Sequence, residues 1–216
     1  MTTSQPSEKE KMLLGKPYHA HLDDTLREER QQCQAAVDRF NQANSHTRAT
    51  SKAEISRLFL AILDPQQRSE YRDYHPGSPP HSRPRRIGHT AIIEPPFFCD
   101  YGYNITIGDE VVISANCQME DPCDIIIGSK VFVGKNVHFC GNAPSDEPHS
   151  RMGSKGLMVG GAIEVEDDVY IGPGTIIMPH RTIGRGARVG PGSVVTEVSP
   201  SIWISLFPLL SKCLND

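Results

Sequence analysis

A six-residue period in aliphatic residues constrains the fold of this chain more than any other feature. Between residues 165 and 195 a branched aliphatic residue recurs at every sixth position, and a glycine directly follows three of these anchors. A period of six matches neither an α-helix nor an isolated β-strand. It is typical of a coil of short parallel strands, in which each hexapeptide forms one side and one turn. The anchors of this run are Val165, Ile171, Ile177, Ile183, Val189 and Val195.

The same period extends toward the N-terminus. Three anchors lie six residues apart from residue 107 onward, and after two extra residues three more resume the spacing: Ile107, Ile113, Met119, Ile127, Val133 and Phe139. An aliphatic-rich sandwich, the alternative fold, predicts looser strand spacing and no fixed phase for glycine. We therefore expect a mainly β fold, a parallel β-helix of hexapeptide repeats over residues 87–198 with an inserted loop at residues 140–161.

Helices are expected before the repeats. Residues 8–63 favour helix, because apolar residues recur there at helical spacing and Asp23 and Asp24 are placed to cap a helix start. These apolar residues are Leu22, Leu26, Cys33, Ala36, Val37 and Phe40. A second helix over residues 51–63 should end before Pro65, because proline cannot continue a helix.

The remaining segments complete the division of the chain. An N-terminal helical region occupies residues 1–74, and residues 75–86, rich in proline and arginine, should form an extended linker or surface loop. Residues 199–216 form an apolar C-terminal tail. The tail either covers the open end of the coil or reflects a misassembled coding sequence.

Composition excludes several classes of partner. A net charge of −4 gives no case for nucleic acid or an anionic membrane surface. No window approaches the roughly 18 apolar residues that a membrane helix needs, and the N-terminus lacks the apolar core of a signal peptide. We therefore expect a cytoplasmic protein with reduced, mostly buried thiols. The cysteines show no zinc-type spacing, so no metal is expected. They are Cys33, Cys99, Cys117, Cys123, Cys140 and Cys213.

Three sequence segments, together with the hexapeptides, point to a known family. They read EKEKMLLGKPYHAHLDDTLREER, PPFFCDYGYNITIG and GPGSVVTE. In one register, over roughly residues 8–199, the chain resembles the maltose and galactoside O-acetyltransferases, which are hexapeptide-repeat acyltransferases. The resemblance implies a left-handed parallel β-helix behind N-terminal helices and a homotrimer with sites between subunits. It also implies transfer of an acetyl group from acetyl-CoA to a hydroxyl, without a metal.

The resemblance also implies a catalytic histidine, and here the chain departs from the family. A hydroxyl must lose its proton as it attacks a thioester, and an imidazole can accept that proton near neutral pH. Ala143 stands at the expected position, on the loop that follows Phe139. His149 on the same loop and His138 beside Phe139 are candidate substitute bases, and His180 is a weaker one. The alternative is that each is an ordinary surface or hydrogen-bonded histidine.

Further positions follow from the resemblance alone. It implies substrate-binding roles for Ser114, Asp121 and Asp146, although the family's asparagine and aspartate are replaced by Ser114 and Pro122. Glu197 replaces a lysine and should repel the phosphates of CoA. The turns expected to face CoA contain small residues that allow a ligand to approach backbone amides closely. Every corner of such a coil needs small residues, whether or not it binds a ligand. The residues in question are Gly172, Gly174, Gly190, Gly192 and Ser193.

Arg181 conflicts with the repeat. It lies four residues after an anchor, where the neighbouring hexapeptides place small or β-branched residues that point inward. A guanidinium inside a narrow coil is costly unless it is paired. We expect Arg181 to turn outward or to bind Glu164 or Glu166.

Two functional hypotheses remain from the sequence. The first is a CoA-dependent O-acetyltransferase that acts on a sugar or small hydroxylated metabolite with a replacement base. The second is a catalytically inactive or repurposed trimeric homologue that serves as a scaffold, a regulator or an enzyme without CoA. Loss of general base help typically costs about 10²- to 10⁴-fold in rate, so it need not abolish turnover. We favour the enzyme.

Overall fold

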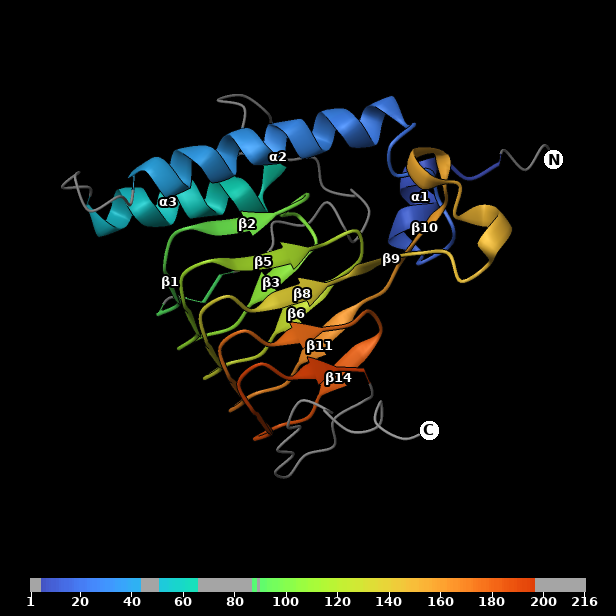
Figure 1. Ribbon diagram of the computed structural model, residues 1–216. Helices are drawn as coiled ribbons and strands as arrows, with labels where there is room; N and C mark the ends of the chain where they lie inside the picture. The colour runs from blue at the N-terminus through green and yellow to red at the C-terminus, as the bar shows by residue number, and fades with distance from the viewer. Residues whose placement is uncertain (1–4, 44–50, 66–86, 89, 197–216) are drawn as a thin grey trace, which may run out of the picture.

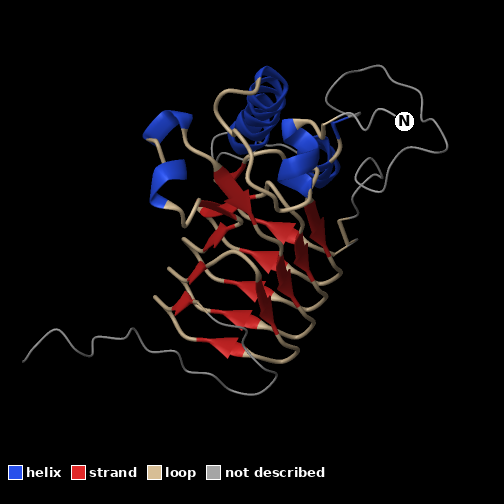
Figure 2. Cartoon of the chain, turned by 90° about the vertical axis from the view of Figure 1, so that its right-hand side faces the viewer, coloured by secondary structure: helices blue, strands red, loops and turns tan. Residues whose placement is uncertain are grey.

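The structure is a coil of parallel strands closed at one end by helices. The computed structural model describes residues 5–43, 51–65, 87–88 and 90–196. The strands stack in layers, and two long helices lie across the N-terminal end of the stack (Figures 1 and 2). The predicted β-helix behind an N-terminal helical region is therefore confirmed. The linker at 75–86, Glu197 and the tail at 199–216 lie outside the described residues.

The strands form three parallel sheets, one along each side of the coil. The first sheet contains β1 (Ile92–Ile93), β4 (Val112–Ile113), β7 (Phe132–Val133), β12 (Tyr170–Ile171) and β15 (Arg188–Val189). The second contains β2 (Phe97–Cys99), β5 (Cys117–Glu120), β8 (His138–Cys140), β13 (Ile176–Ile177) and β16 (Val194–Val195). The third contains β3 (Ile105–Ile107), β6 (Ile125–Ile127), β11 (Ile163–Val165) and β14 (Arg181–Ile183).

Every predicted anchor lies in a strand and points into the coil. None of these side chains is more than 1% exposed. Every third anchor belongs to the same sheet, so Met119 lies opposite Phe139 and Ile177 opposite Val195. The six-residue period thus gives both the inward face and the pairing of the strands, as the sequence predicts.

The inserted loop leaves and rejoins the coil through an antiparallel pair. β9 (Asn142–Pro144) pairs with β10 (Met158–Gly160), and two short 3₁₀ turns, η2 (Pro148–Ser150) and η3 (Gly153–Lys155), lie between them. Met158 exchanges backbone hydrogen bonds of 3.0 and 2.9 Å with Tyr18. The loop therefore projects from the coil together with the N-terminal segment (Figure 1).

The N-terminal region contains three helices, one of which is the predicted helix at residues 51–63. They are α1 (Glu8–Leu13), α2 (Asp24–Ala43) and α3 (Lys52–Leu63). The chain turns after α1 at Gly15, whose φ of 65° suits glycine. Leu22 lies before α2 and is 56% exposed, so its predicted burial is wrong. The other predicted apolar positions of α2 are all buried: Leu26, Cys33, Ala36, Val37 and Phe40.

Sequence signals fix the helix ends. The Asp23 Oδ1 atom accepts a hydrogen bond of 2.8 Å from the Leu26 amide, as expected for a cap at the start of α2. The Ser51 side chain accepts from the Glu54 amide at the start of α3. α3 ends two residues before Pro65, as predicted.

None of the described helices is long and apolar enough to cross a membrane.

α2 and α3 cover the first turn of the coil. Phe59 packs edge-on against Phe40 and Phe97, with ring centroids 5.2 and 5.3 Å apart. The Asn41 side chain donates to the Phe97 carbonyl and accepts from the Phe97 amide, both at 2.9 Å. These bonds satisfy backbone groups of the edge strand β2, which would otherwise offer a template for pairing.

Arg181 lies in the last strand of the third sheet and is half-buried. Its Nη1 atom donates to the His180 carbonyl at 2.9 Å. Among the described residues no ion pair joins it to Glu164 or Glu166, and Glu166 instead accepts from the Arg185 amide. No described strand of the third sheet stacks beyond β14, yet the Arg181 Nε atom is buried and has no hydrogen-bond partner among the described residues.

Replacement of one anchor should be far more costly than replacement of its outward neighbour. Ile127 is 1% exposed and Ile126, beside it on β6, is 37% exposed. We expect Ile127→Ala to lower the free energy of unfolding by about 2–5 kcal/mol, because it leaves a cavity in the coil. Ile126→Ala should cost less than about 1 kcal/mol. Urea unfolding at equal protein concentration measures both, and equal losses would contradict the assignment of inward and outward faces.

Candidate functional site

The outer face of the second sheet carries the polar side chains of the candidate site. Strand alternation sends Gln118 and Glu120 outward from β5, and His138 and Cys140 outward from β8. The register places Gln118 opposite His138 and Glu120 opposite Cys140. Side chains that are opposite on neighbouring strands lie within contact distance. His138 therefore points out of the coil.

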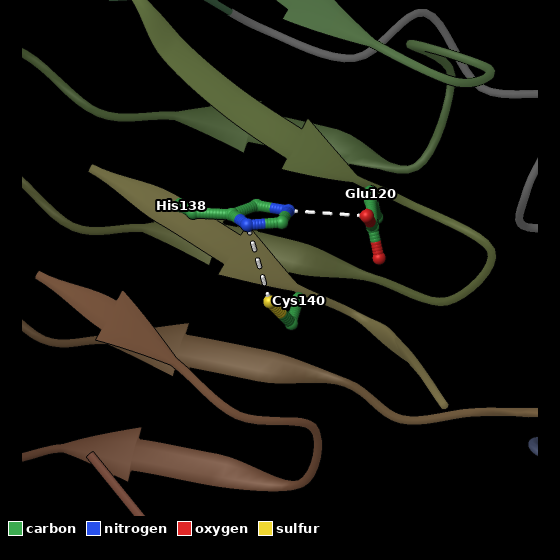
Figure 3. A group of neighbouring side chains, drawn as sticks. All are labelled: Glu120, His138 and Cys140. Atoms are coloured by element: carbon green, nitrogen blue, oxygen red, sulfur yellow. Dashed lines mark hydrogen bonds and ion pairs between the residues drawn. The ribbon is translucent and has the colours of Figure 1, made fainter. Parts of the chain in front are cut away.

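The imidazole of His138 lies between a carboxylate and a thiol. Its Nε2 atom is 3.1 Å from Oε1 of Glu120, and its Nδ1 atom is 3.4 Å from Sγ of Cys140 (Figure 3). The His138 and Glu120 side chains are 30% and 27% exposed. All three groups are therefore ordered by mutual contacts and still accessible to a ligand.

Gly141 holds this arrangement at the end of β8. Its amide donates to the Glu120 carbonyl at 3.0 Å. A Cβ atom at this position would lie 2.1 Å from that carbonyl oxygen. Only glycine permits so close an approach, and the approach keeps Cys140 beside Glu120.

The contacts of His138 determine its charge. Its hydrogen bond with Cys140, and then that with Glu120, raise the pKa of His138 from an ordinary 6.5 to about 10, although burial acts in the opposite direction. The imidazole therefore carries a proton at neutral pH. Burial, and then the nearby Glu120 carboxylate, raise the pKa of Asp100 to about 6.

A cleft of about 270 Å³ lies beside this group. It is lined by Gln34 of α2, by Phe98, Cys99 and Gln118 of the second sheet, and by Asp100, which follows β2. Gln118 is the residue opposite His138, so the cleft adjoins the imidazole along the sheet. Its lining combines one aromatic ring with amide and carboxyl groups.

The other candidate histidines lie elsewhere. His149 is exposed on η2, in the loop beyond β9 and β10. His180 has a left-handed backbone with φ of 60° and packs over Gly161, where the inserted loop returns. Ala143 lies in β9, opposite Val159 of β10. Of the three candidate histidines, His138 is the one held between two functional groups.

The predicted substrate-binding residues do not lie together. Asp121 is fully buried, and its Oδ1 atom accepts from the amides of Asp100 and Tyr101 at 3.0 and 2.8 Å. Burial raises the pKa of Asp121 to about 8. Ser114 is buried at the corner after β4, and Asp146 is exposed on the inserted loop. Asp121 thus orders the turn that carries Asp100, and a substrate role for the three stays a prediction.

The predicted CoA-facing turns lie at the corner between the first and second sheets. Gly174 and Gly192 are exposed there with φ of 71° and 69°. Gly172 is buried, and a Cβ atom on it would lie 2.5 Å from the Pro191 nitrogen, so stacking of the coil already requires this glycine. The Ser193 hydroxyl is buried and donates to the Gly190 carbonyl at 2.7 Å. A cofactor-binding role for these residues stays a prediction.

One backbone contact connects these turns to His138. The His138 amide donates to the Thr175 carbonyl at 2.9 Å, directly after Gly174. His138 therefore lies between the predicted CoA turns and the cleft. Sequence reasoning selected His138 but missed Glu120 and Cys140. The anchors contained the missing signal. Met119 and Phe139 are three anchors apart, so they lie opposite each other in the same sheet, and the residues that follow them, Glu120 and Cys140, must be neighbours.

Glu120, His138 and Cys140 also form the one group among the described residues whose ligand atoms could hold a metal ion, all within 4.8 Å of one another. One nitrogen of His138, a Glu120 carboxylate oxygen and the Cys140 sulfur could face a common ion. In this structure the two ring nitrogens are directed to different partners. The imidazole is thus held between a carboxylate and a thiol.

Comparisons with known proteins agree with this fold. The maltose acetyltransferase hexapeptide capping motif matches residues 11–65, and the bacterial transferase hexapeptide (six repeats) matches residues 162–197. A Schizosaccharomyces pombe relative, which is named only provisionally as an acetyltransferase, is 31% identical over 193 residues, 89% of this chain and 84% of its own length.

Two solved structures are similar over nearly the whole chain. The maltose O-acetyltransferase of Clostridium difficile 630 is 30% identical with a TM-score of 0.74, over 92% of this chain and 91% of its own. A hexapeptide-repeat acetyltransferase of Vibrio cholerae O1 biovar eltor, solved with acetyl coenzyme A, is 28% identical with a TM-score of 0.70, over 91% of both chains. The extent of these matches shows that the chain belongs to the hexapeptide-repeat acyltransferases of the maltose and galactoside O-acetyltransferase type.

Proposed function

We propose that this protein transfers an acetyl group from acetyl-CoA to a hydroxyl of a sugar or similar small metabolite, with His138 as the group that moves the proton. The observation that carries the proposal is the position of His138 between the cleft and the coil turns, with its ring held by Glu120 at 3.1 Å. Glu120 acts as a positioning residue, since its contact with Nε2 leaves Nδ1 of His138 directed to Cys140.

The cleft fits a small polar acceptor. Its volume of about 270 Å³ is below the roughly 300–1,000 Å³ of sites for drug-sized ligands. Gln34, Gln118 and Asp100 offer donors and acceptors for hydroxyl groups, and the Phe98 ring offers an apolar face against which a sugar ring can pack. The lining thus favours a polyhydroxylated acceptor over an apolar one.

The donor side rests on the exposed corner turns. Gly174 and Gly192 lack side chains, so an extended pantetheine arm can approach the backbone amides of the corner. The acetyl-CoA complex of the Vibrio cholerae relative supports the choice of donor. The His138 amide bonds the Thr175 carbonyl, which supports a position of the thioester near the imidazole.

A homotrimer is part of the proposal. Large apolar side chains are exposed on the outer faces of the coil, where they would be covered if coils packed side by side. They include Ile92 and Phe132 on the first sheet and Phe98, Ile176 and Val194 on the second. The site on the second sheet would then lie between subunits. The free thiols of the described cysteines fit the expected cytoplasmic location.

Substitution of His138 should abolish most of the activity. We expect His138→Asn to lower kcat by about 10²- to 10⁴-fold, because an amide cannot exchange the proton. His149→Asn is the matched control and should retain wild-type kcat, since His149 is exposed on the inserted loop. Release of CoA, measured with a thiol reagent against a panel of sugars, compares the variants.

Calorimetric titration with CoA separates loss of chemistry from loss of binding. His138→Asn should bind CoA as the wild-type protein does. If the wild-type protein does not bind CoA at millimolar concentration, the transferase proposal is overturned in favour of a scaffold or an enzyme without CoA. If His149→Asn rather than His138→Asn loses activity, the transferase proposal stands and the assignment of the base is wrong.

Glu120→Gln should lower the pKa of His138 from about 10 toward 6.5. NMR titration of the imidazole measures this shift, and Glu164→Gln, on an exposed position of β11, is the control. The folded-state pKa lies above the unfolded value, so the stabilisation is fully present below pH 6.5 and is lost as the pH rises through about 10. Glu120→Gln should therefore destabilise the protein more at pH 6.5 than above pH 10. An unchanged midpoint would contradict the pairing.

A further inference from the structure

Cys140 differs from the other described cysteines. Cys33, Cys99, Cys117 and Cys123 are buried, whereas Cys140 is partly exposed on the outer face of the second sheet. The buried four are packed as small apolar side chains. Cys140 instead contacts His138, so its thiol faces a functional group rather than the core.

The three side chains follow one another as carboxylate, imidazole and thiol. Glu120 contacts one ring nitrogen of His138, and Cys140 contacts the other, at 3.1 and 3.4 Å (Figure 3). A nucleophile within hydrogen-bond reach of a base, with the base oriented by a third group, is the arrangement of an activated nucleophile. A thiolate next to a protonated imidazole is stabilised by its charge.

We propose that Cys140 accepts the acetyl group from acetyl-CoA as a thioester before the hydroxyl acceptor receives it. This inference rests on the proposed transferase function and adds a covalent intermediate to it. The residues that carry it lie on two adjacent strands, where the register holds them in place.

The first half-reaction exchanges one thioester for another. The Cys140 sulfur, as thiolate, attacks the acetyl carbonyl and forms the new carbon–sulfur bond. The carbon–sulfur bond to CoA breaks, and the departing CoA sulfur takes the proton from the His138 imidazolium. CoA leaves as a free thiol, the enzyme holds S-acetyl Cys140, and His138 is left neutral.

The second half-reaction transfers the acetyl group to the acceptor. The hydroxyl oxygen attacks the S-acetyl carbonyl while neutral His138 takes the hydroxyl proton. The carbon–sulfur bond to Cys140 breaks, and the sulfur leaves as thiolate. The product is the acetyl ester, and the thiolate and imidazolium are restored. No metal, oxidant or further reactant is needed.

This order of steps accounts for the charge of His138 in the resting site. With a pKa of about 10, the imidazole already carries a proton at neutral pH and cannot accept another from a hydroxyl. Direct transfer would require it to be neutral. Departure of CoA with the proton makes it neutral, and acetylation of Cys140 removes one of the two contacts that raise the pKa of His138.

The intermediate should be detectable without any acceptor. Wild-type protein mixed with acetyl-CoA alone should gain the mass of one acetyl group and release one equivalent of CoA in a burst. Neutral hydroxylamine should remove the group, as it does from thioesters, and peptide mapping should place it on Cys140. Cys140→Ala should gain no acetyl group. Cys213→Ser and Cys123→Ser are the controls that should still be labelled.

Kinetics provide a second measurement. Double-reciprocal plots against both substrates should be parallel, as for a ping-pong reaction. Residues that act as one unit are not additive, so the double variant with His138→Asn and Cys140→Ala should be no slower than the slower single variant. Glu120→Gln should slow acetylation, and Glu164→Gln should leave it unchanged.

The outcomes distinguish this inference from the function on which it rests. Turnover of acetyl-CoA with an acceptor, but with no label on rapid quench and full activity in Cys140→Ala, would overturn the covalent intermediate and leave the transferase function intact. Absence of both CoA binding and turnover would overturn the function itself. Stoichiometric zinc that is lost in Cys140→Ala would overturn the inference in favour of a metal site.

Discussion

The pairing of each hexapeptide with the equivalent one in the next turn is the interaction on which the rest of this structure depends. Backbone bonds run from turn to turn, for example from the Gly108 amide to Ile127 at 2.8 Å and from the Gly128 amide to Val165 at 2.7 Å. Inside the coil these bonds stack one anchor on another. On the outside they bring into contact residues that are 18 or more positions apart in the chain.

The sequence predicts the inside of the coil better than its outside. An anchor such as Ile177 is selected by a local requirement, one aliphatic residue per side, and the repeat makes that requirement visible. The outer face obeys no such period, so Glu120 and Cys140 carry no local signature. Their contact with His138 becomes predictable only when the anchors Met119 and Phe139 are placed opposite each other, because the two extra residues after Met119 change the spacing between turns.

The prediction for Leu22 is wrong for a related reason. Leu22 continues a helical pattern, yet Gly15 and the turns after it delay the helix until Asp24, so the pattern is read one turn too early. At Asp121 the sequence does not reveal that two backbone amides donate to the carboxyl group inside the turn, and its substrate role stays a prediction. Neither a period nor a motif reports such tertiary contacts.

The location of the functional groups has a consequence for catalysis. The resemblance places the base on the inserted loop, where this chain has Ala143. The imidazole of His138 instead belongs to a strand that is hydrogen-bonded on both edges, to β5 and β13. Groups on such a strand are held more firmly than groups on a loop. A strand residue cannot move toward the substrate, so it must already be in place and in the correct charge state. The carboxylate on one side of the ring and the thiol on the other raise the pKa of His138. Under the proposed function, the outer face of the sheet, rather than the loop, is therefore where we expect the substrate to bind.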